Sequence, residues 1–166
     1  MRIEICTLDS EDLKTLGSAI PKYVIERADE DGYYTIGIVK KKTDDPILGI
    51  AQFFVNITRT GECFGELIYI YMTEKYRKQG MGGRMLDHAA GILKRSGISI
   101  FTFLLPYPAD KKLAYPMSQK ETESFFGSCG FFKVKPDLEL WVTTMDELVP
   151  DISQKKVTRY IRLTDR

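Results

Sequence analysis

The chain has few of the residues that bind metals. Its 166 residues include three cysteines and one histidine. Cys6, Cys63 and Cys129 lie far apart, and their spacing matches no metal-site pattern. We therefore expect no bound metal, and we interpret the cysteines as small core residues or incidental thiols.

Long hydrophobic runs and an excess of one charge are also missing. No apolar run approaches the roughly 18 residues of a membrane-spanning helix, and residues 1–10 lack the apolar centre of a signal peptide. These features predict a cytoplasmic protein with no membrane partner. The 24 basic and 23 acidic residues leave a formal net charge of +1, which argues against a large nucleic-acid-binding surface.

Strand patterns occupy much of the N-terminal half. Residues 2–8 alternate apolar with polar side chains, and longer strand-like runs follow at residues 33–39, 47–57 and 64–72. Short connections join these last three runs, which predicts an antiparallel meander.

Two helical pieces are expected between the first and second strands. Asp9 or Ser10 can cap a helix over residues 11–20, because their side-chain oxygens accept hydrogen bonds from free backbone N–H groups. The apolar positions of this segment fit one helical face. Pro21 ends or breaks the helix, and residues 22–28 predict a second piece.

The second half of the chain alternates helices with strands. The expected elements are a helix over residues 84–96, a strand over 98–105, a helix from 118 to 130, and strands over 131–134 and 138–144. Ser118 and Glu121 form the capping box of the second helix. No repeat or linker interrupts the order, so we expect one α/β domain over residues 1–166. Its core would span about 1–144, with a C-terminal extension over 145–166.

A glycine-rich junction between strand and helix suggests chemistry. Residues 66–86 run from a strand through a polar loop and Gly80–Gly83 into a helix. The first helical N–H groups have no partner within the helix, and the helix dipole is positive there. Because glycines let these groups approach an anion closely, and Arg77, Lys78 and Arg84 add positive charge, the segment predicts a pyrophosphate cradle. The alternative is a tight turn beside a solvated basic face.

Two other nucleotide sites do not fit this segment. A P-loop requires Gly-Lys followed by Ser or Thr, and the loop has no such triplet. A dinucleotide-binding fold would open with its glycine fingerprint in an initial βαβ unit. Here a meander of predicted strands comes first.

Three motifs in residues 33–144 resemble one family. Arg77-x-x-Gly80-x-Gly82 is similar to the [Q/R]-x-x-G-x-[G/A] acyl-coenzyme A motif of GNAT N-acetyltransferases, and residues 70–72 resemble the end of that family's fourth strand. Phe125-Phe126-x-x-x-Gly130-Phe131 resembles the family's F-Y-x-x-x-G-F signature. The resemblance implies an α/β fold in which helices flank a mostly antiparallel sheet that is splayed between strands 4 and 5. It also implies acetyl-coenzyme A as the acyl donor.

The same resemblance implies where the donor binds. Backbone groups of residues 70–72 would hold the pantetheine amides as an added strand would, and N–H groups of residues 78–83 would hold the pyrophosphate. An N–H group near the end of strand 4 could polarise the thioester carbonyl. The expected cofactor-binding residues are Ile70, Tyr71, Met72, Arg77, Lys78, Gln79, Gly80, Met81, Gly82, Gly83, Arg84, Gln119 and Phe126.

Acyl transfer to an amine requires a neutral nucleophile. A lysine-type amine has a pKa near 10.4, so a base must remove a proton directly or through water. Glu66 matches the position that often provides this base in the family; the alternative is a partly exposed strand-end carboxylate. His88, the only histidine, falls in mid-helix and is interpreted as a surface or core residue.

The expected acid departs from the family pattern. Relatives commonly use the tyrosine of F-Y-x-x-x-G-F to protonate the leaving thiolate, and Phe126 has no hydroxyl. Tyr115, Tyr107 or Ser124 could replace it, or solvent could suffice. The chain could also bind acyl-coenzyme A without turnover. Phe126 itself is expected to pack against the pantetheine arm.

Two segments bear on the acceptor and on assembly. The loop over residues 106–117 could line the acceptor site or be a plain surface loop. Residues 157–163 alternate apolar with basic side chains and could add an edge strand or a homodimer contact. The favoured function is N-acetyl transfer to an amine of a small molecule, peptide or protein. The alternatives are a catalytically silent acyl-coenzyme A sensor and transfer of a larger acyl group.

Overall fold

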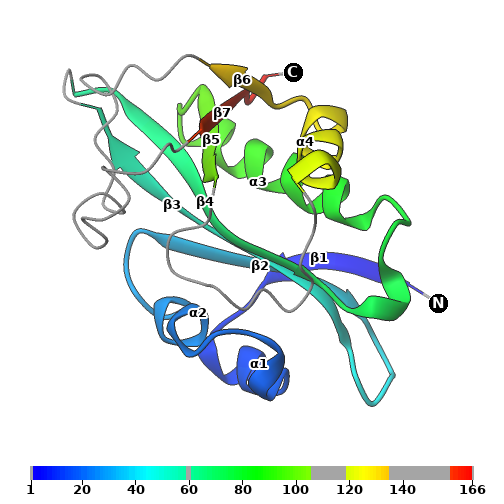
Figure 1. Ribbon diagram of the computed structural model, residues 1–166. Helices are drawn as coiled ribbons and strands as arrows, with labels where there is room; N and C mark the ends of the chain where they lie inside the picture. The colour runs from blue at the N-terminus through cyan, green and yellow to red at the C-terminus, as the bar shows by residue number, and fades with distance from the viewer. Residues whose placement is uncertain (1, 59–60, 106–118, 135–157, 166) are drawn as a thin grey trace.

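The computed structural model of the chain describes residues 2–58, 61–105, 119–134 and 158–165. Its centre is one seven-stranded sheet with the strand order β1-β2-β3-β4-β5-β7-β6. Helices α1 and α2 lie on one side of this sheet, and α3 and α4 lie on the other (Figure 1). The elements are β1 (Ile3–Thr7), α1 (Ser10–Lys14), η1 (Gly17–Ala19), α2 (Lys22–Arg27), β2 (Tyr33–Lys40), β3 (Ile47–Ile57), β4 (Cys63–Met72), η2 (Glu74–Tyr76), α3 (Met81–Arg95), β5 (Ile100–Leu105), α4 (Gln119–Ser128), β6 (Phe132–Val134) and β7 (Thr158–Leu163).

The predicted antiparallel meander is confirmed. Strands β1 to β4 pair in chain order, and each pair is antiparallel. One irregularity lies in β4, where Gln52 and Phe53 of β3 face Tyr69 and Leu67, so that Ile68 is an extra residue. A bulge of this kind bends its strand and breaks the ladder locally. The bend comes directly after Glu66, the last residue of β4 that pairs with β5.

The first helix is shorter than its apolar pattern predicts. Asp9 caps α1, and its side chain and that of Asp12 each accept a hydrogen bond from the other residue's backbone N–H. The helix ends at Lys14, because Gly17 adopts a left-handed conformation with φ 57°. The expected continuous helix over residues 11–20 is therefore wrong, although Leu13 and Ile20 are still buried against the sheet.

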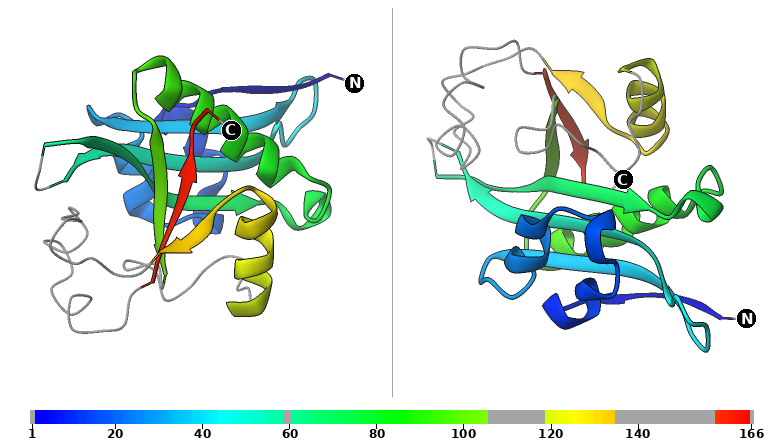
Figure 2. Two further views of the ribbon diagram at one scale, coloured as in Figure 1. Left: turned by 90° about the horizontal axis from the view of Figure 1, so that it is seen from above. Right: turned by 60° about the horizontal axis from the view of Figure 1, so that its bottom comes forward.

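The expected splay between the fourth and fifth strands is confirmed. β4 and β5 run parallel and pair at two positions, Gly65 with Phe101 and Glu66 with Thr102. Beyond Glu66 the two strands diverge, and β5 and β7 cross the direction of β1 to β4 (Figure 2). The sheet therefore opens into a V whose vertex is at Glu66.

The C-terminal strand corrects an expectation. Residues 158–163 do not form an edge strand, because β7 lies between β5 and β6 and pairs antiparallel with both. The basic residues of this strand are buried, and Arg159 and Arg162 form ion pairs with Glu66 and Asp87. This part of the expected extension therefore belongs to the sheet. The predicted strand over 138–144 lies outside the described residues.

Candidate functional site

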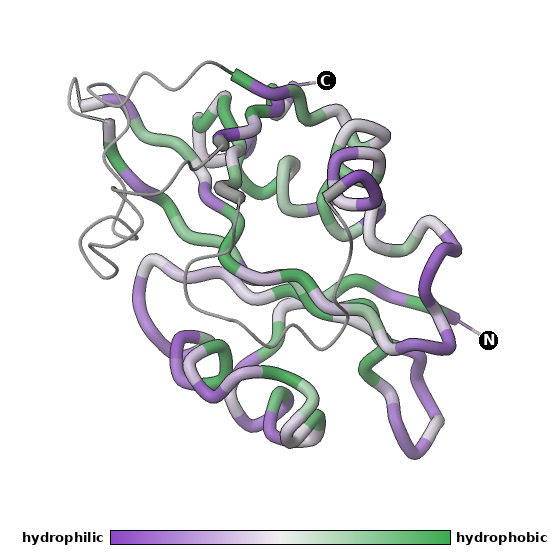
Figure 3. The backbone as a smooth tube through the Cα atoms, viewed as in Figure 1, coloured by the Kyte–Doolittle hydropathy of each residue, from purple (hydrophilic) through white to green (hydrophobic). Residues whose placement is uncertain are grey.

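A cleft of about 750 Å³ lies between the end of β4, the start of α3 and helix α4. The loop that closes one end of it, between β4 and α3, is hydrophilic along most of its length (Figure 3). The lining consists of Tyr69, Ile70, Tyr71, Met72, Tyr76, Arg77, Lys78, Gly80, Met81, Gly82, Gly83, Asp87, Lys120, Glu121, Thr122, Ser124, Phe125, Phe126, Ser128 and Cys129. It contains most of the residues expected to bind the cofactor.

Side-chain hydrogen bonds fix the glycine loop. Arg77 donates through Nε to the Met72 carbonyl at 2.8 Å, which ties the loop back to the strand end. Gln79 donates through Nε2 to the Lys75 carbonyl at 3.0 Å. Gln79 and Arg84, both expected to bind the cofactor, lie outside the cleft lining. Gln119, another expected residue, is the first residue of α4.

The first turn of α3 has the features of an anion site. Gly80 caps the helix in a left-handed conformation with φ 78°, and Arg84 N–H donates to its carbonyl at 3.2 Å. The N–H groups of Met81 to Gly83 have no acceptor within the helix, and the N-cap residue Gly80 has no side-chain hydrogen bond to them. The helix dipole therefore concentrates positive potential at the cleft.

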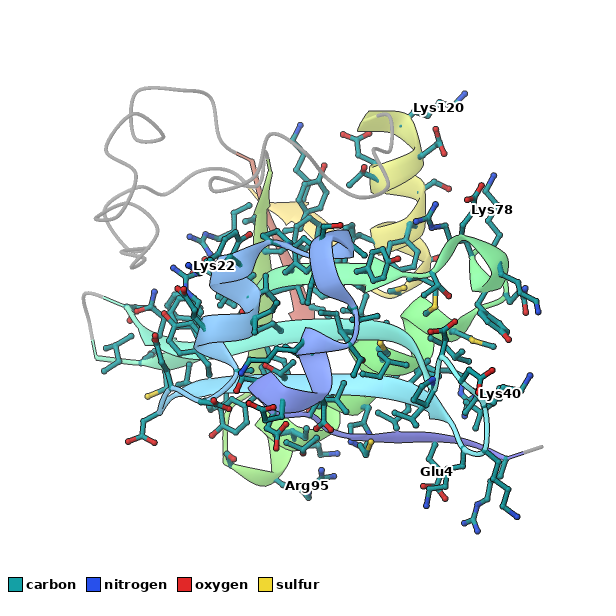
Figure 4. The ribbon with its side chains drawn as sticks, turned by 90° about the horizontal axis from the view of Figure 1, so that it is seen from below. Glu4, Lys22, Lys40, Lys78, Arg95 and Lys120 are labelled. Atoms are coloured by element: carbon teal, nitrogen blue, oxygen red, sulfur yellow. The ribbon has the colours of Figure 1, made fainter. Side chains whose placement is uncertain are left out.

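Basic side chains add to this potential. Arg77 and Lys78 of the loop line the cleft, and Lys120 lines it from the start of α4. Lys78 and Lys120 extend toward the same side of the molecule (Figure 4). The cleft thus combines helical N–H groups that lack an acceptor within the helix with cationic side chains, which is the combination that binds phosphate groups.

Glycine at position 82 is also needed for packing. A Cβ atom on Gly82 would lie 2.9 Å from Cζ of Phe125 in α4. One residue further, a Cβ on Gly83 would lie 3.5 Å from Sγ of Cys129. The glycines thus let α4 approach the N-terminus of α3. This contact could not be found from the sequence, because Gly82 and Phe125 are more than 40 residues apart in the chain.

One edge of β4 is open toward the cleft. Ile70, Tyr71 and Met72 pair with β3 on one side. On the other side, the pairing of β4 with β5 ends at Glu66. An extended ligand can add to such an edge through backbone hydrogen bonds.

Phe126 is a core residue that also lines the cleft. Its side chain is buried, and its ring centroid lies 3.8 Å from that of Phe103 and 5.6 Å from that of Phe131. The nearby hydroxyl of Tyr160 donates to Glu123 at 3.1 Å. Burial, then the hydrogen bond and charge of Glu123, raise the pKa of Tyr160 above 10.0. Neither Tyr160 nor Glu123 lines the cleft, so this hydroxyl does not replace the missing one.

Three other side chains were expected as possible acids for the leaving thiolate. Ser124 lines the cleft from α4. Tyr115 and Tyr107 lie outside the described residues, as does the whole 106–117 loop.

Glu66 lies at the vertex of the V. Its carboxylate is 1% exposed, and Arg159 donates to Oε1 at 3.1 Å. Arg159 also donates to Oγ1 of Thr102 at 3.1 Å, and Thr102 donates to the Gly65 carbonyl at 3.2 Å. Glu66 is therefore not a partly exposed strand-end carboxylate. Arg159 could not be found from the sequence, because it lies 93 residues further along the chain.

The remaining ionisable candidates do not enter the cleft. His88 lies in the middle of α3 and outside the cleft lining, and burial, then the charge of Arg95, lower its pKa. Among the described residues, no group of three or more His, Cys, Asp or Glu side chains could hold a metal ion. No described helix is long and apolar enough to cross a membrane.

Comparison with known proteins gives a family match and several similar structures. A model of the Acetyltransferase (GNAT) family matches residues 4–113, whereas no curated protein sequence matches significantly. The fold is similar to that of the ribosomal-protein-S18-alanine N-acetyltransferase from Escherichia coli, with TM-score 0.63, 12% identity, and coverage of 98% of this chain and 94% of that chain. A chain of the NatC complex bound to Gag peptide and CoA gives TM-score 0.64 at 14% identity, with coverage of 98% and 99%. N-acetylglutamate synthase from Neisseria gonorrhoeae, complexed with coenzyme A and N-acetyl-glutamate, gives 0.67 at 16% identity, with coverage of 100% and 36%.

Proposed function

Because the chain belongs to the GNAT acetyltransferase family, we propose that it transfers the acetyl group of acetyl-coenzyme A directly to an amine. The observation that carries this proposal is a single cleft that joins the free N-terminus of α3 to the open edge of β4. The first feature suits a diphosphate, and the second suits an amide-bearing arm.

In the proposed complex, different parts of coenzyme A contact different residues of the cleft. N–H groups of Met81, Gly82 and Gly83 would hold the diphosphate, and Lys78 and Lys120 would add charge. Backbone groups of residues 70–72 would hold the pantetheine amides. Bound acetyl-coenzyme A would supply an activated acetyl thioester, whose carbonyl a backbone N–H near the strand end could polarise.

Proton removal from the acceptor amine is assigned to Glu66. Since this carboxylate lies outside the cleft lining and is buried, we expect it to act through a water molecule. For the leaving thiolate, protonation by solvent, Ser124 or Tyr115 stays a prediction. The acceptor is an amine of a small molecule, peptide or protein. Homodimer formation also stays a prediction.

A thiol-release assay with a panel of amines tests this function. Turnover with acetyl-coenzyme A and at least one amine, lost by about a hundredfold or more in Glu66→Gln, is expected for a general base. The double variant Glu66→Gln/Arg159→Met serves as the control for folding, because it leaves no unpaired buried charge. If it folds and keeps wild-type turnover, Glu66 is not the base. Mass analysis of the product would show whether the acyl group is acetyl or larger.

One observation favours a second function. The position of the family's hydroxyl is occupied by the buried ring of Phe126, which offers no proton. A catalytically silent acyl-coenzyme A sensor would bind the thioester and release no thiol with any amine. Tight binding without turnover across the panel would therefore favour the sensor over the enzyme.

A further inference from the structure

Arg159 joins three strands at the two positions where the described residues of β4 and β5 pair. It comes from β7, and its Nη1 atom lies 3.1 Å from Glu66 of β4 and 3.1 Å from Thr102 of β5. Its side chain is 6% exposed, and that of Glu66 is 1% exposed. The guanidinium also lies 5.7 Å from the ring centroid of Phe64. The vertex of the V therefore contains a buried guanidinium group.

The surroundings of Glu66 would otherwise favour its neutral form. Residues directly opposite each other on paired strands share a face, so Phe54 of β3 flanks the carboxylate. Phe64 and Ile68, two residues before and after it in β4, are both buried. Burial among such side chains disfavours an ionised carboxylate. A protonated carboxyl cannot accept the proton of an amine or a water molecule.

Arg159 opposes this effect of burial. An opposite charge at hydrogen-bonding distance favours the ionised carboxylate by an amount similar to that of burial. Arg159 is a charged group in direct contact with Glu66, Thr102 pairs with Glu66 from β5, and Phe54 pairs with it from β3. Arg27 lies over the Tyr33 ring at 5.4 Å, and Tyr33 pairs with Phe54, so this cation is one strand further from Glu66.

We infer that Arg159 is a positioning residue for the acyl transfer: it holds Glu66 ionised and oriented at the vertex of the V, ready to accept the proton that leaves the amine. This inference rests on the proposed function. It assigns a role to the C-terminal strand, 93 residues from the carboxylate. Thr102, which also accepts from Arg159, fixes the guanidinium against β5.

A titration of Glu66 tests the charge relation without any turnover. The protein is labelled with ¹³C at the glutamate side-chain carboxyl carbons, and the Glu66 signal is the one absent from Glu66→Gln. In the wild type we expect Glu66 to be ionised at neutral pH. In Arg159→Met the midpoint of protonation should rise by about 1–3 pH units, and Arg159→Lys should restore most of the difference.

The pH profile of kcat/KM tests the catalytic consequence. The ascending limb, on which kcat/KM rises with pH, should shift to higher pH by the same interval in Arg159→Met. It should shift back in Arg159→Lys. Arg162→Met, which removes another buried arginine of β7 and keeps the Arg159–Glu66 pair, should leave the limb in place. A merely structural Arg159 would lower the melting temperature of Arg159→Met and leave both the titration and the limb unchanged, which would overturn the inference. A titration that moves while the profile does not would also overturn it and would leave the acetyltransferase function standing.

Discussion

Gly82 has a packing role that the structure shows and a binding role in the proposed function. Its N–H group belongs to the free first turn of α3, and its missing side chain leaves room for Phe125. A Cβ atom at position 82 would lie 2.9 Å from the Phe125 ring, so this ring has to shift when a larger residue replaces Gly82. The glycine pattern that resembles an acyl-coenzyme A motif is therefore also the surface on which α4 rests.

We predict that Gly82→Ala lowers the free energy of unfolding by about 1–3 kcal/mol, because overpacking forces Phe125 from its position. Adding Phe125→Leu should recover part of this loss, since the shorter side chain leaves the contact. Chemical denaturation of the three proteins measures both effects.

Gly91→Ala is the matched control in the same helix. A Cβ there would meet only the far end of Arg95, at 3.5 Å, so alanine should stabilise the protein by about 0.5–1 kcal/mol. Equal effects of alanine at positions 82 and 91 would contradict the packing role of Gly82.

At the scale of elements, an ion pair connects β7 to helix α3. Arg162 of β7 is 4% exposed, and its Nη1 atom lies 2.8 Å from Oδ1 of Asp87 in α3. Asp87 is largely exposed and lines the cleft. β7, which lies between β5 and β6 in the sheet, thus also holds the helix whose first turn faces the cleft.

We predict that Asp87→Ala costs about 1–3 kcal/mol of unfolding free energy, more than an ordinary surface substitution, because it leaves a buried guanidinium without its carboxylate. The double variant Asp87→Ala/Arg162→Met should recover most of the loss. A cost below about 0.5 kcal/mol in denaturant titrations would show that the pair contributes little.

Elements set by local patterns were predictable, whereas long-range partners were not. The alternating runs of β2, β3 and β4 have short connections, so their pairing follows from neighbouring residues. β7 pairs with β5 although the two strands are more than 50 residues apart in the chain. Its alternating basic residues are typical of a solvated edge strand, and only the folded structure shows that Arg159 and Arg162 are paired with Glu66 and Asp87. The glycine motif located the cleft, but the contact between Gly82 and Phe125 and the burial of Glu66 depend on tertiary packing.

For the whole molecule, His88 predicts how stability depends on pH. Burial, then Arg95, lower the pKa of this imidazole below 6.5. The unfolded chain therefore binds a proton at a higher pH than the folded protein does. The stability that the neutral imidazole contributes is complete above about pH 6.5 and is lost as the pH falls through the lowered pKa.

Thermal melts at pH 7.5 and pH 5.5 measure this effect. His88→Gln, which cannot titrate, should lose less melting temperature between the two pH values than the wild type does. Identical losses in the two proteins would show that His88 does not contribute to acid sensitivity.

In the proposed function, the N-terminus of α3 binds the diphosphate of coenzyme A. Calorimetric titration with coenzyme A and with acetyl-coenzyme A, using the wild type, Gly82→Asp and Gly91→Asp, tests it most directly. We predict that the wild type binds both compounds. The affinity should fall by at least about tenfold, or about 1.4 kcal/mol, in Gly82→Asp. It should stay near that of the wild type in Gly91→Asp. This last variant carries the same charge about two and a half turns away along α3. No binding by the wild type, or equal affinities of Gly82→Asp and the wild type, would contradict the account.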